Sequence, residues 1–158
     1  MMTENHNSLV TSPKAGLPAM TKSVDASLRR LASSWTMAER VPERAIEHIP
    51  AAIAHAEASL EPCGQKGAAV LLLELWSIFP MPANETADRI WNETLSQYPA
   101  DLVKSAISQL IATRTWERDA PVPGQVVALL RDEHSSRNSY LRKLQSMQKR
   151  ATLDAKGT

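Results

Sequence analysis

The sequence predicts an all-α protein, a single compact bundle of about five or six helices. Two observations support this class. After residue 22 the apolar residues recur with a period near 3.6, the period of one helix face, and no useful stretch alternates with the period of two that is typical of a strand. Prolines and glycines separate the periodic segments by short connections, which favour a compact arrangement.

Three regions differ in composition. Residues 1–21 contain two prolines, one glycine and few apolar residues, so we expect a disordered N-terminal tail. Residues 22–133 hold most of the periodic apolar positions and are predicted to form the helical domain. Residues 134–158 have a helix-forming composition but a thin apolar face, mainly Leu141 and Leu144, and predict a basic, partly flexible C-terminal helix or tail that is solvent-facing or frayed.

The first predicted helix covers residues 23–35, with Ser23 as a candidate N-cap. Its apolar face consists of Val24, Leu28, Leu31 and Trp35. The next segment, residues 39–62, keeps the same period but contains Pro50. A proline clashes with the preceding turn of a helix, so we expect a kink there, or a new helix that starts near residue 50.

Residues 65–80 are apolar on most of the helix circumference and predict the central, most buried helix. The inward positions are Ala68, Leu71, Leu72, Leu75 and Phe79. A further helix is expected from Asn84, its candidate N-cap, to Tyr98, with Trp91 in the core. Pro99 then opens a helix with an apolar face from Leu102 to Ile111. A last helix is expected after Pro121 and Pro123.

The charge is unevenly distributed. The formal net charge is +1, which gives no overall electrostatic reason to bind nucleic acid. Residues 62–125 hold five basic and seven acidic residues, a net charge of −2, whereas residues 126–158 hold seven basic and three acidic residues, a net charge of +4. The sequence therefore describes a mildly acidic body with a basic C-terminal segment.

No pattern in the sequence indicates catalysis, a metal or a cofactor, so we expect a protein that is not an enzyme. A single cysteine, Cys63, excludes a disulfide framework and fits a reducing compartment. His48 and His55 are seven residues apart, whereas zinc ligands on one helix usually lie four apart. The longest apolar run is interrupted by Glu74 and is too short to cross a bilayer. Because no signal peptide pattern is present either, we expect a cytoplasmic protein.

Two features have the composition of a binding surface. Trp116 lies between Arg114 and Arg118 at the predicted end of a helix, a combination common in binding hot spots. The alternative is a tryptophan that folds back onto the body. The basic C-terminal segment can bind nucleic acid or an acidic partner surface, or it can be merely solvated, and charge patterning alone does not separate these cases.

The stretches "LLLELWSIFP" and "ADRIWNETLSQYPADLVKSAISQLIATRTWERDAPVPGQVVALLRD" resemble the small phage proteins that load and inhibit the replicative hexameric helicase. The resemblance covers about residues 66–133. It rests on the Trp91–Leu95 pair, a helix of the form VxxAIxxLI at residues 103–111, a proline-bearing turn, and the helix from there to Leu130. Residues 23–60 depart from the family pattern.

The resemblance implies an α-helical scaffold and a flexible C-terminal segment, here about residues 131–150, that contacts the helicase. The expected function is a non-enzymatic phage or prophage accessory protein that binds the replicative helicase and loads or inhibits it. Two alternatives stay open: a helix-turn-helix DNA-binding regulator that uses the basic C-terminal helix, and an inhibitor of another host protein. The candidate partner-binding residues are Trp116, Arg137, Tyr140, Leu141, Arg142, Lys143, Leu144, Lys149 and Arg150.

Overall fold

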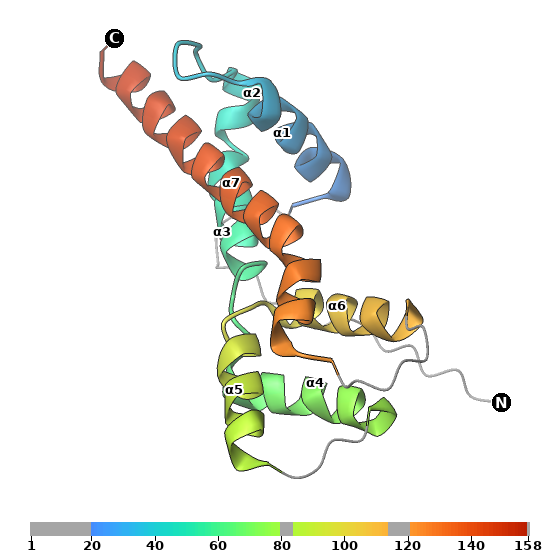
Figure 1. Cartoon of the computed structure of the whole chain (residues 1–158). Coiled ribbons are helices and arrows are strands. Elements are labelled where there is room, and N and C mark those ends of the chain that lie inside the picture. The colour runs from blue at the N-terminus through green and yellow to red at the C-terminus, as the bar shows by residue number, and fades with distance from the viewer. Residues whose placement is uncertain (1–19, 80–83, 114–120, 158) are drawn as a thin grey trace, which may run out of the picture. The chain divides into compact units, whose positions relative to one another are not determined.

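The computed structural model describes residues 20–79, 84–113 and 121–157, and the predicted all-α class is confirmed: this part of the chain forms helices and no strand (Figure 1). The predicted disordered tail lies, up to residue 19, outside the described residues. The helices are α1 (Lys22–Ser34), α2 (Glu43–Ile46), α3 (Ile49–Ala58), α4 (Gly64–Ile78), α5 (Glu85–Leu95), α6 (Ala100–Ala112) and α7 (Pro123–Lys156).

The helices group into two compact units. Unit 1 contains the described residues up to Ala58 together with those from Leu144 onward, so it combines α1, α2 and α3 with the C-terminal part of α7. Unit 2 is the continuous segment Ser59–Lys143, which holds α4, α5, α6 and the first part of α7. Each unit is described below by itself.

Helix α1 begins one residue earlier than its predicted cap. The Thr21 side chain is the N-cap: its Oγ1 accepts a hydrogen bond from the Val24 amide at 3.2 Å, and its backbone is extended. The prediction of Ser23 as N-cap is therefore wrong, because Ser23 already lies inside the helix and an N-cap residue needs a non-helical backbone.

Pro50 coincides with a new helix rather than a kink. Helix α2 ends at Ile46, and α3 starts at Ile49, with Pro50 in its first turn. Amides of the first turn have no partner within their own helix, so a proline there loses no hydrogen bond. Of the two outcomes expected from the sequence, the new helix is the correct one.

Unit 1 is built around small residues. Ala51, Ala52 and Ala56 of α3 are buried, and such short side chains let neighbouring helices approach closely. The larger buried side chains of unit 1 are Leu28, Trp35, Val41, Ile49, Leu144 and Met147. Leu144 and Met147 are both 0% exposed, so the expectation of a solvent-facing or frayed C-terminal helix is wrong here. Met147 continues the ridge of Leu144 one turn further along the helix.

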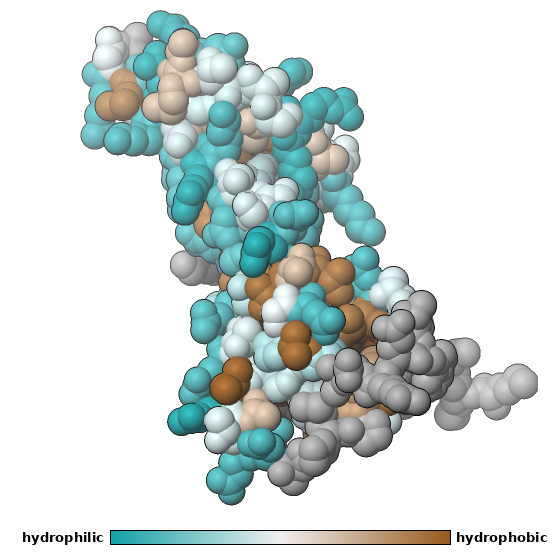
Figure 2. Space-filling view, viewed as in Figure 1, coloured by the Kyte–Doolittle hydropathy of each residue, from teal (hydrophilic) through white to brown (hydrophobic). Residues whose placement is uncertain are grey.

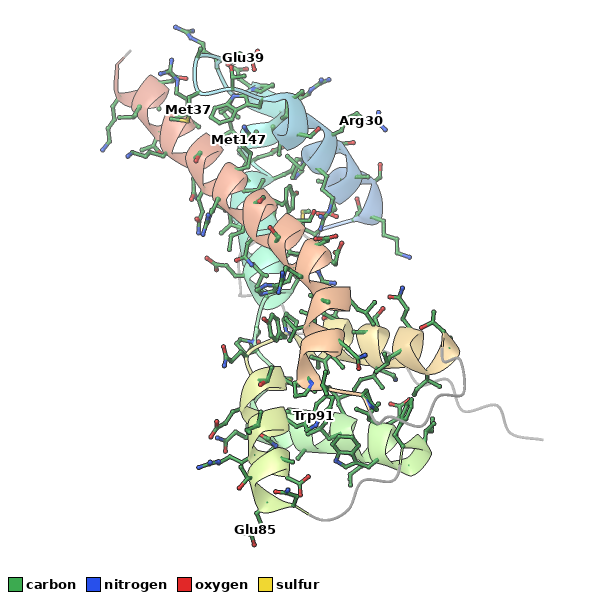
Figure 3. The ribbon with its side chains drawn as sticks, in the orientation of Figure 1. Arg30, Met37, Glu39, Glu85, Trp91 and Met147 are labelled. Atoms are coloured by element: carbon green, nitrogen blue, oxygen red, sulfur yellow. The ribbon has the colours of Figure 1, made fainter. Side chains whose placement is uncertain are left out.

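Unit 2 has a continuous apolar core to which α4, α5, α6 and α7 all contribute. Its buried members are Ala68, Leu72, Leu75, Phe79, Trp91, Leu95, Leu102, Val103, Ala106, Ile107, Val126 and Leu130. Trp91 is 2% exposed, and its ring meets the ring of Trp76 edge-on with centroids 5.0 Å apart. Figure 3 shows Trp91 on the side of α5 toward α4, while Glu85 marks the exposed start of α5. The core position predicted for Trp91 is confirmed.

The connection into α4 is tied to the turn between α5 and α6. The Cys63 amide donates to the Tyr98 carbonyl at 2.9 Å, and the Gly64 amide donates to the Ser96 carbonyl at 3.1 Å. Gly64 has a φ of 67°, a left-handed conformation that glycine adopts without the steric cost of a Cβ atom. At the other end of α4, the predicted cap of the next helix is confirmed: Asn84 Oδ1 accepts from two amides of α5, each at 3.1 Å.

Candidate partner-binding site

Helix α7 carries all of the nine candidate partner-binding residues except Trp116. It runs without a break through 34 residues. Residues 125–156 contain neither proline nor glycine, so nothing in this stretch interrupts the helix. At its start the Gln125 side chain accepts a hydrogen bond from the Val122 amide at 2.9 Å, which satisfies an amide that has no partner within the helix. The predicted basic tail is thus the continuation of a helix that starts in unit 2.

Arg137 is a structural residue of unit 2. Its guanidinium donates to both carboxylate oxygens of Asp101, at 3.2 and 2.6 Å, to Glu133 at 3.1 Å and to the Ser59 carbonyl at 2.9 Å. These bonds join α7 to the start of α6 and to the segment that precedes α4. Mainly because of the hydrogen bonds to Asp101, the pKa of Arg137 is raised, although burial opposes the shift. The side chain therefore stays charged, with its donors directed within unit 2.

The aromatic and aliphatic candidates on α7 differ in exposure. Tyr140 and Leu141 are half-buried, so part of each side chain faces solvent. Leu144 is completely buried in unit 1. A docking role for Leu144 would require unit 1 to open, whereas Tyr140 and Leu141 can contact a partner as they stand.

Two of the cationic candidates on α7, Arg142 and Lys149, are exposed. Lys156, which was not among the candidates, is exposed as well, and the three residues recur every seven positions, which places them along one face of the helix. Lys143 and Arg150 are half-buried, and Arg150 Nη2 pairs with Asp154 Oδ1 at 3.3 Å. Residues 134–158 hold six basic residues against one acidic residue, Asp154. This part of α7 is therefore strongly cationic.

Trp116 lies outside the described residues, so its proposed role as a binding hot spot stays a prediction.

The α5–α6 pair has the connection length of a helix-turn-helix motif, with four residues between Leu95 and Ala100. A recognition helix needs side chains that reach phosphates and base edges, typically Arg, Lys, Asn or Gln. The exposed positions of α6 between residues 104 and 109 are Lys104, Ser105, Ser108 and Gln109. One cation and one amide in this face give α6 little capacity to bind DNA.

The described part of the chain contains no group of three or more His, Cys, Asp or Glu residues that could hold a metal ion. His48 Nε2 lies 3.2 Å from Glu47 Oε1, and the ring of His134 packs edge-on against Tyr98 at 5.1 Å. Burial raises the pKa of the Cys63 thiol, whose Sγ donates to the Leu95 carbonyl at 3.4 Å. None of the described helices is both long enough and apolar enough to cross a membrane.

One exposed surface was missed by the sequence analysis. Helix α4 was expected to be the central, most buried helix because apolar residues occupy most of its circumference, yet Val70 is 66% exposed and Leu73 is 69% exposed. Its burial is limited to one face, formed by Ala68, Leu72, Leu75 and Phe79, which packs into the core of unit 2. The signal was present in the sequence: Val70 lies on the side of a helix opposite to that four-residue stripe.

In the face of the molecule drawn in Figure 2, brown apolar side chains gather over unit 2, whereas the surface of unit 1 is mostly teal and white.

Comparisons with family models, with curated proteins and with solved structures found no match to this chain.

Proposed function

We propose that this chain is a non-enzymatic accessory protein of phage or prophage type that binds the replicative helicase and loads or inhibits it. The choice of helicase rests on the sequence resemblance over about residues 66–133. The observation that carries a binding function is the exposed cationic face of α7, formed by Arg142, Lys149 and Lys156. A face of this kind attracts an acidic protein surface and accelerates its docking.

The mechanism is docking of α7 on the helicase ring. The three exposed cations approach an acidic surface of the partner, and the half-exposed Tyr140 and Leu141 supply apolar contact beside it. Aromatic anchors of this type dominate the affinity of many interfaces, and charges mainly set the rate and the orientation of docking. Occupation of the ring surface by a rigid helix would then block the ring or hold it open.

The runner-up function is binding of duplex DNA, and the same observation favours it. The sugar–phosphate backbone is a polyanion that neutralises exposed lysine and arginine side chains. Since the exposed face of α6 offers a single cation, DNA contact would run through α7 and would read phosphates rather than bases. Inhibition of a different host protein through the same face of α7 is the third candidate.

The test compares two variants of α7 in binding to purified helicase and to duplex DNA. The first replaces the three exposed cations (Arg142→Ala, Lys149→Ala and Lys156→Ala), and the matched control replaces two exposed neutral residues of the same helix (Gln145→Ala and Gln148→Ala). If each exposed charge pair contributes about 0.2–1 kcal/mol, the triple variant should bind helicase roughly tenfold more weakly. The control should bind like the parent.

A Tyr140→Ala/Leu141→Ala variant separates the two partners. It should weaken helicase binding and leave any duplex binding unchanged, because phosphate contacts do not use apolar anchors. If the chain instead binds duplex tightly, with a log–log salt slope of roughly −3 that is lost in the triple variant, the DNA-binding function replaces the helicase one. Absence of helicase binding in the parent chain at low salt rejects the proposal and favours another host protein.

A further inference from the structure

Helix α4 has two apolar faces, and the core of unit 2 uses only one of them. The core face contains Ala68 and Leu75, both 0% exposed. On the opposite side Val70 and Leu73 are the two most exposed large apolar side chains among those that the structure describes. Burial of a leucine or valine side chain away from water is favourable, so two such residues at the centre of one helix face favour association with another apolar surface.

The charges around this face are arranged symmetrically. Lys66 lies four residues before Val70 and Glu74 lies four residues after it, and both side chains are exposed. Residues four apart on a helix lie on the same side, so Lys66, Val70 and Glu74 form one row along α4. The row has a positive end, an apolar centre and a negative end.

A row of this kind is complementary to itself when it is turned around. If two α4 helices pack antiparallel with Val70 against Val70, Lys66 of each copy lies level with Glu74 of the other, and two opposite-charge pairs form. A parallel pair would instead bring the two lysines together and the two glutamates together. The antiparallel arrangement also has twofold symmetry, which is the commonest symmetry of protein dimers.

The same register also places Leu73 at the interface. In an antiparallel pair centred on Val70, Leu73 lies level with Gly67 of the second copy, a residue without a side chain. The aliphatic part of the Lys66 side chain can cover Leu73 from the side. We therefore propose that α4 is a self-association surface through which two copies of this chain pair antiparallel about Val70.

The expected dimer is weak. The 15 residues of α4 span roughly 22 Å, and one helix pair of this length buries less area than the 1,200–2,000 Å² of a typical stable interface. We expect a reversible dimer with a Kd on the order of 0.1 mM, populated when copies are concentrated on a common target. This inference stands apart from the proposed helicase function, since it uses no residue of α7.

The first experiment measures self-association of the full chain by sedimentation equilibrium between about 10 µM and 1 mM, a range that brackets the expected Kd. Leu73→Lys should raise the Kd at least about 100-fold, because each dimer loses two buried leucines and gains two buried charges. The matched control is Ile90→Lys, which replaces another exposed apolar residue of unit 2, 49% exposed on α5. It should leave the Kd unchanged. Circular dichroism of both variants verifies that the helices are intact.

A charge exchange tests the orientation. Lys66→Glu alone and Glu74→Lys alone should each raise the Kd by about three- to tenfold, since each places two like-charge pairs in the dimer. The double variant restores opposite charges at both ends and should return the Kd to that of the parent. A parallel dimer would show no such rescue.

A cysteine at the symmetry axis tests the register. Antiparallel helices 8–10 Å apart bring two residues on the axis within the Cα separation of a disulfide. Val70→Cys should therefore form a covalent dimer under mild oxidation, while Ile90→Cys and the parent chain, which has only the half-buried Cys63, should not. The proposal is overturned if the parent chain stays monomeric at 1 mM, if Ile90→Lys disrupts the dimer as strongly as Leu73→Lys, or if the double charge exchange fails to rescue.

Discussion

The two units differ in how the chain supplies their cores. Unit 2 is the uninterrupted segment Ser59–Lys143, so all of its core residues lie within 85 residues of sequence. Unit 1 joins the residues up to Ala58 to those from Leu144 onward, and its core therefore depends on a contact between distant parts of the chain. Closing a long loop costs conformational entropy that a contiguous unit does not lose. The same all-α class thus covers one unit built from a continuous segment and one built from two distant segments.

The side chains in the two cores differ as well. Unit 2 buries Trp91, Phe79 and several Leu and Ile residues in one connected cluster. Among the described residues, five of the eleven buried apolar residues of unit 1 are alanines, and two of its larger buried side chains, Leu144 and Met147, belong to α7. Since the hydrophobic contribution scales with the apolar area removed from water, unit 1 should lose a larger share of its stability when α7 is shortened.

Deletion of residues 144–158 should have the largest effect. It removes both Leu144 and Met147 from unit 1, and we expect α1 and α3 to lose their protection against amide hydrogen exchange. The amides of α4, α5 and α6 should keep theirs, because every buried residue of the unit 2 core is retained. Hydrogen exchange with mass spectrometry measures both units in one sample. Persistent protection of α1 and α3 in the shortened chain would show that unit 1 holds together without α7.

Trp91→Ala should be the most costly single substitution in unit 2. The side chain is 2% exposed and packs edge-on against Trp76, so its removal leaves a large cavity. We expect a loss of about 3–5 kcal/mol in the free energy of unfolding, as for other buried tryptophans. Urea denaturation followed by far-ultraviolet circular dichroism measures this loss. A midpoint close to that of the parent would contradict the central position of Trp91 in this core.

Leu144→Ala should have a somewhat smaller effect, confined to unit 1. Truncation of a fully buried leucine to alanine costs about 2–5 kcal/mol, less than expected for a buried tryptophan because fewer buried atoms are removed. The control is Leu153→Ala, on the same helix and in the same unit but 54% exposed. We expect this variant to change stability by less than about 0.5 kcal/mol. Equal losses in both variants would mean that the burial of Leu144 does not stabilise unit 1.

The sequence was sufficient for features that arise locally. The helical period, the cap at Asn84, the new helix beside Pro50 and the core position of Trp91 all follow from residues within a few turns of one another. The sequence was not sufficient where contacts between distant segments determine which residues are buried. The C-terminal part of α7 has few apolar residues, so its period alone indicates exposure, yet Leu144 and Met147 are fully buried in unit 1, whose other buried residues lie before Ser59.

Two features of the candidate sites show the same limit. In the sequence, Arg137 is one of several cations in a basic segment. Its structural role could not be predicted, because its partners Asp101 and Ser59 lie 36 and 78 residues away. The sequence predicts a buried α4 because apolar residues occupy most of its own circumference. Which face is covered, however, depends on how the neighbouring helices pack against it. By contrast, the exposed cations of α7 were recognisable, since charge on a helix usually faces water.

Arg137 links three segments of unit 2, and its replacement by lysine should have the smallest measurable effect. Asp101 and Glu133 are 61% and 57% exposed, so water screens their attraction to the guanidinium. The Ser59 carbonyl bond is partly buried and depends on the fork of the guanidinium, which lysine lacks. We therefore expect Arg137→Lys to cost about 1 kcal/mol and Asp101→Asn to cost less.

Measurements at different salt concentrations and pH values distinguish the hydrogen bond to Ser59 from the ion pairs to Asp101 and Glu133. If the Ser59 bond dominates, the cost of Arg137→Lys should stay nearly constant between about 0.05 M and 1 M salt, whereas an ion-pair contribution should fall over this range. The raised pKa of Arg137 means that its stabilising effect is complete below the ordinary arginine pKa and is lost only as pH rises through the raised value. The difference between parent and variant should therefore be flat from about pH 6 to pH 9. A cost that disappears in high salt, matched by an equal cost for Asp101→Asn, would assign the link to the ion pair instead.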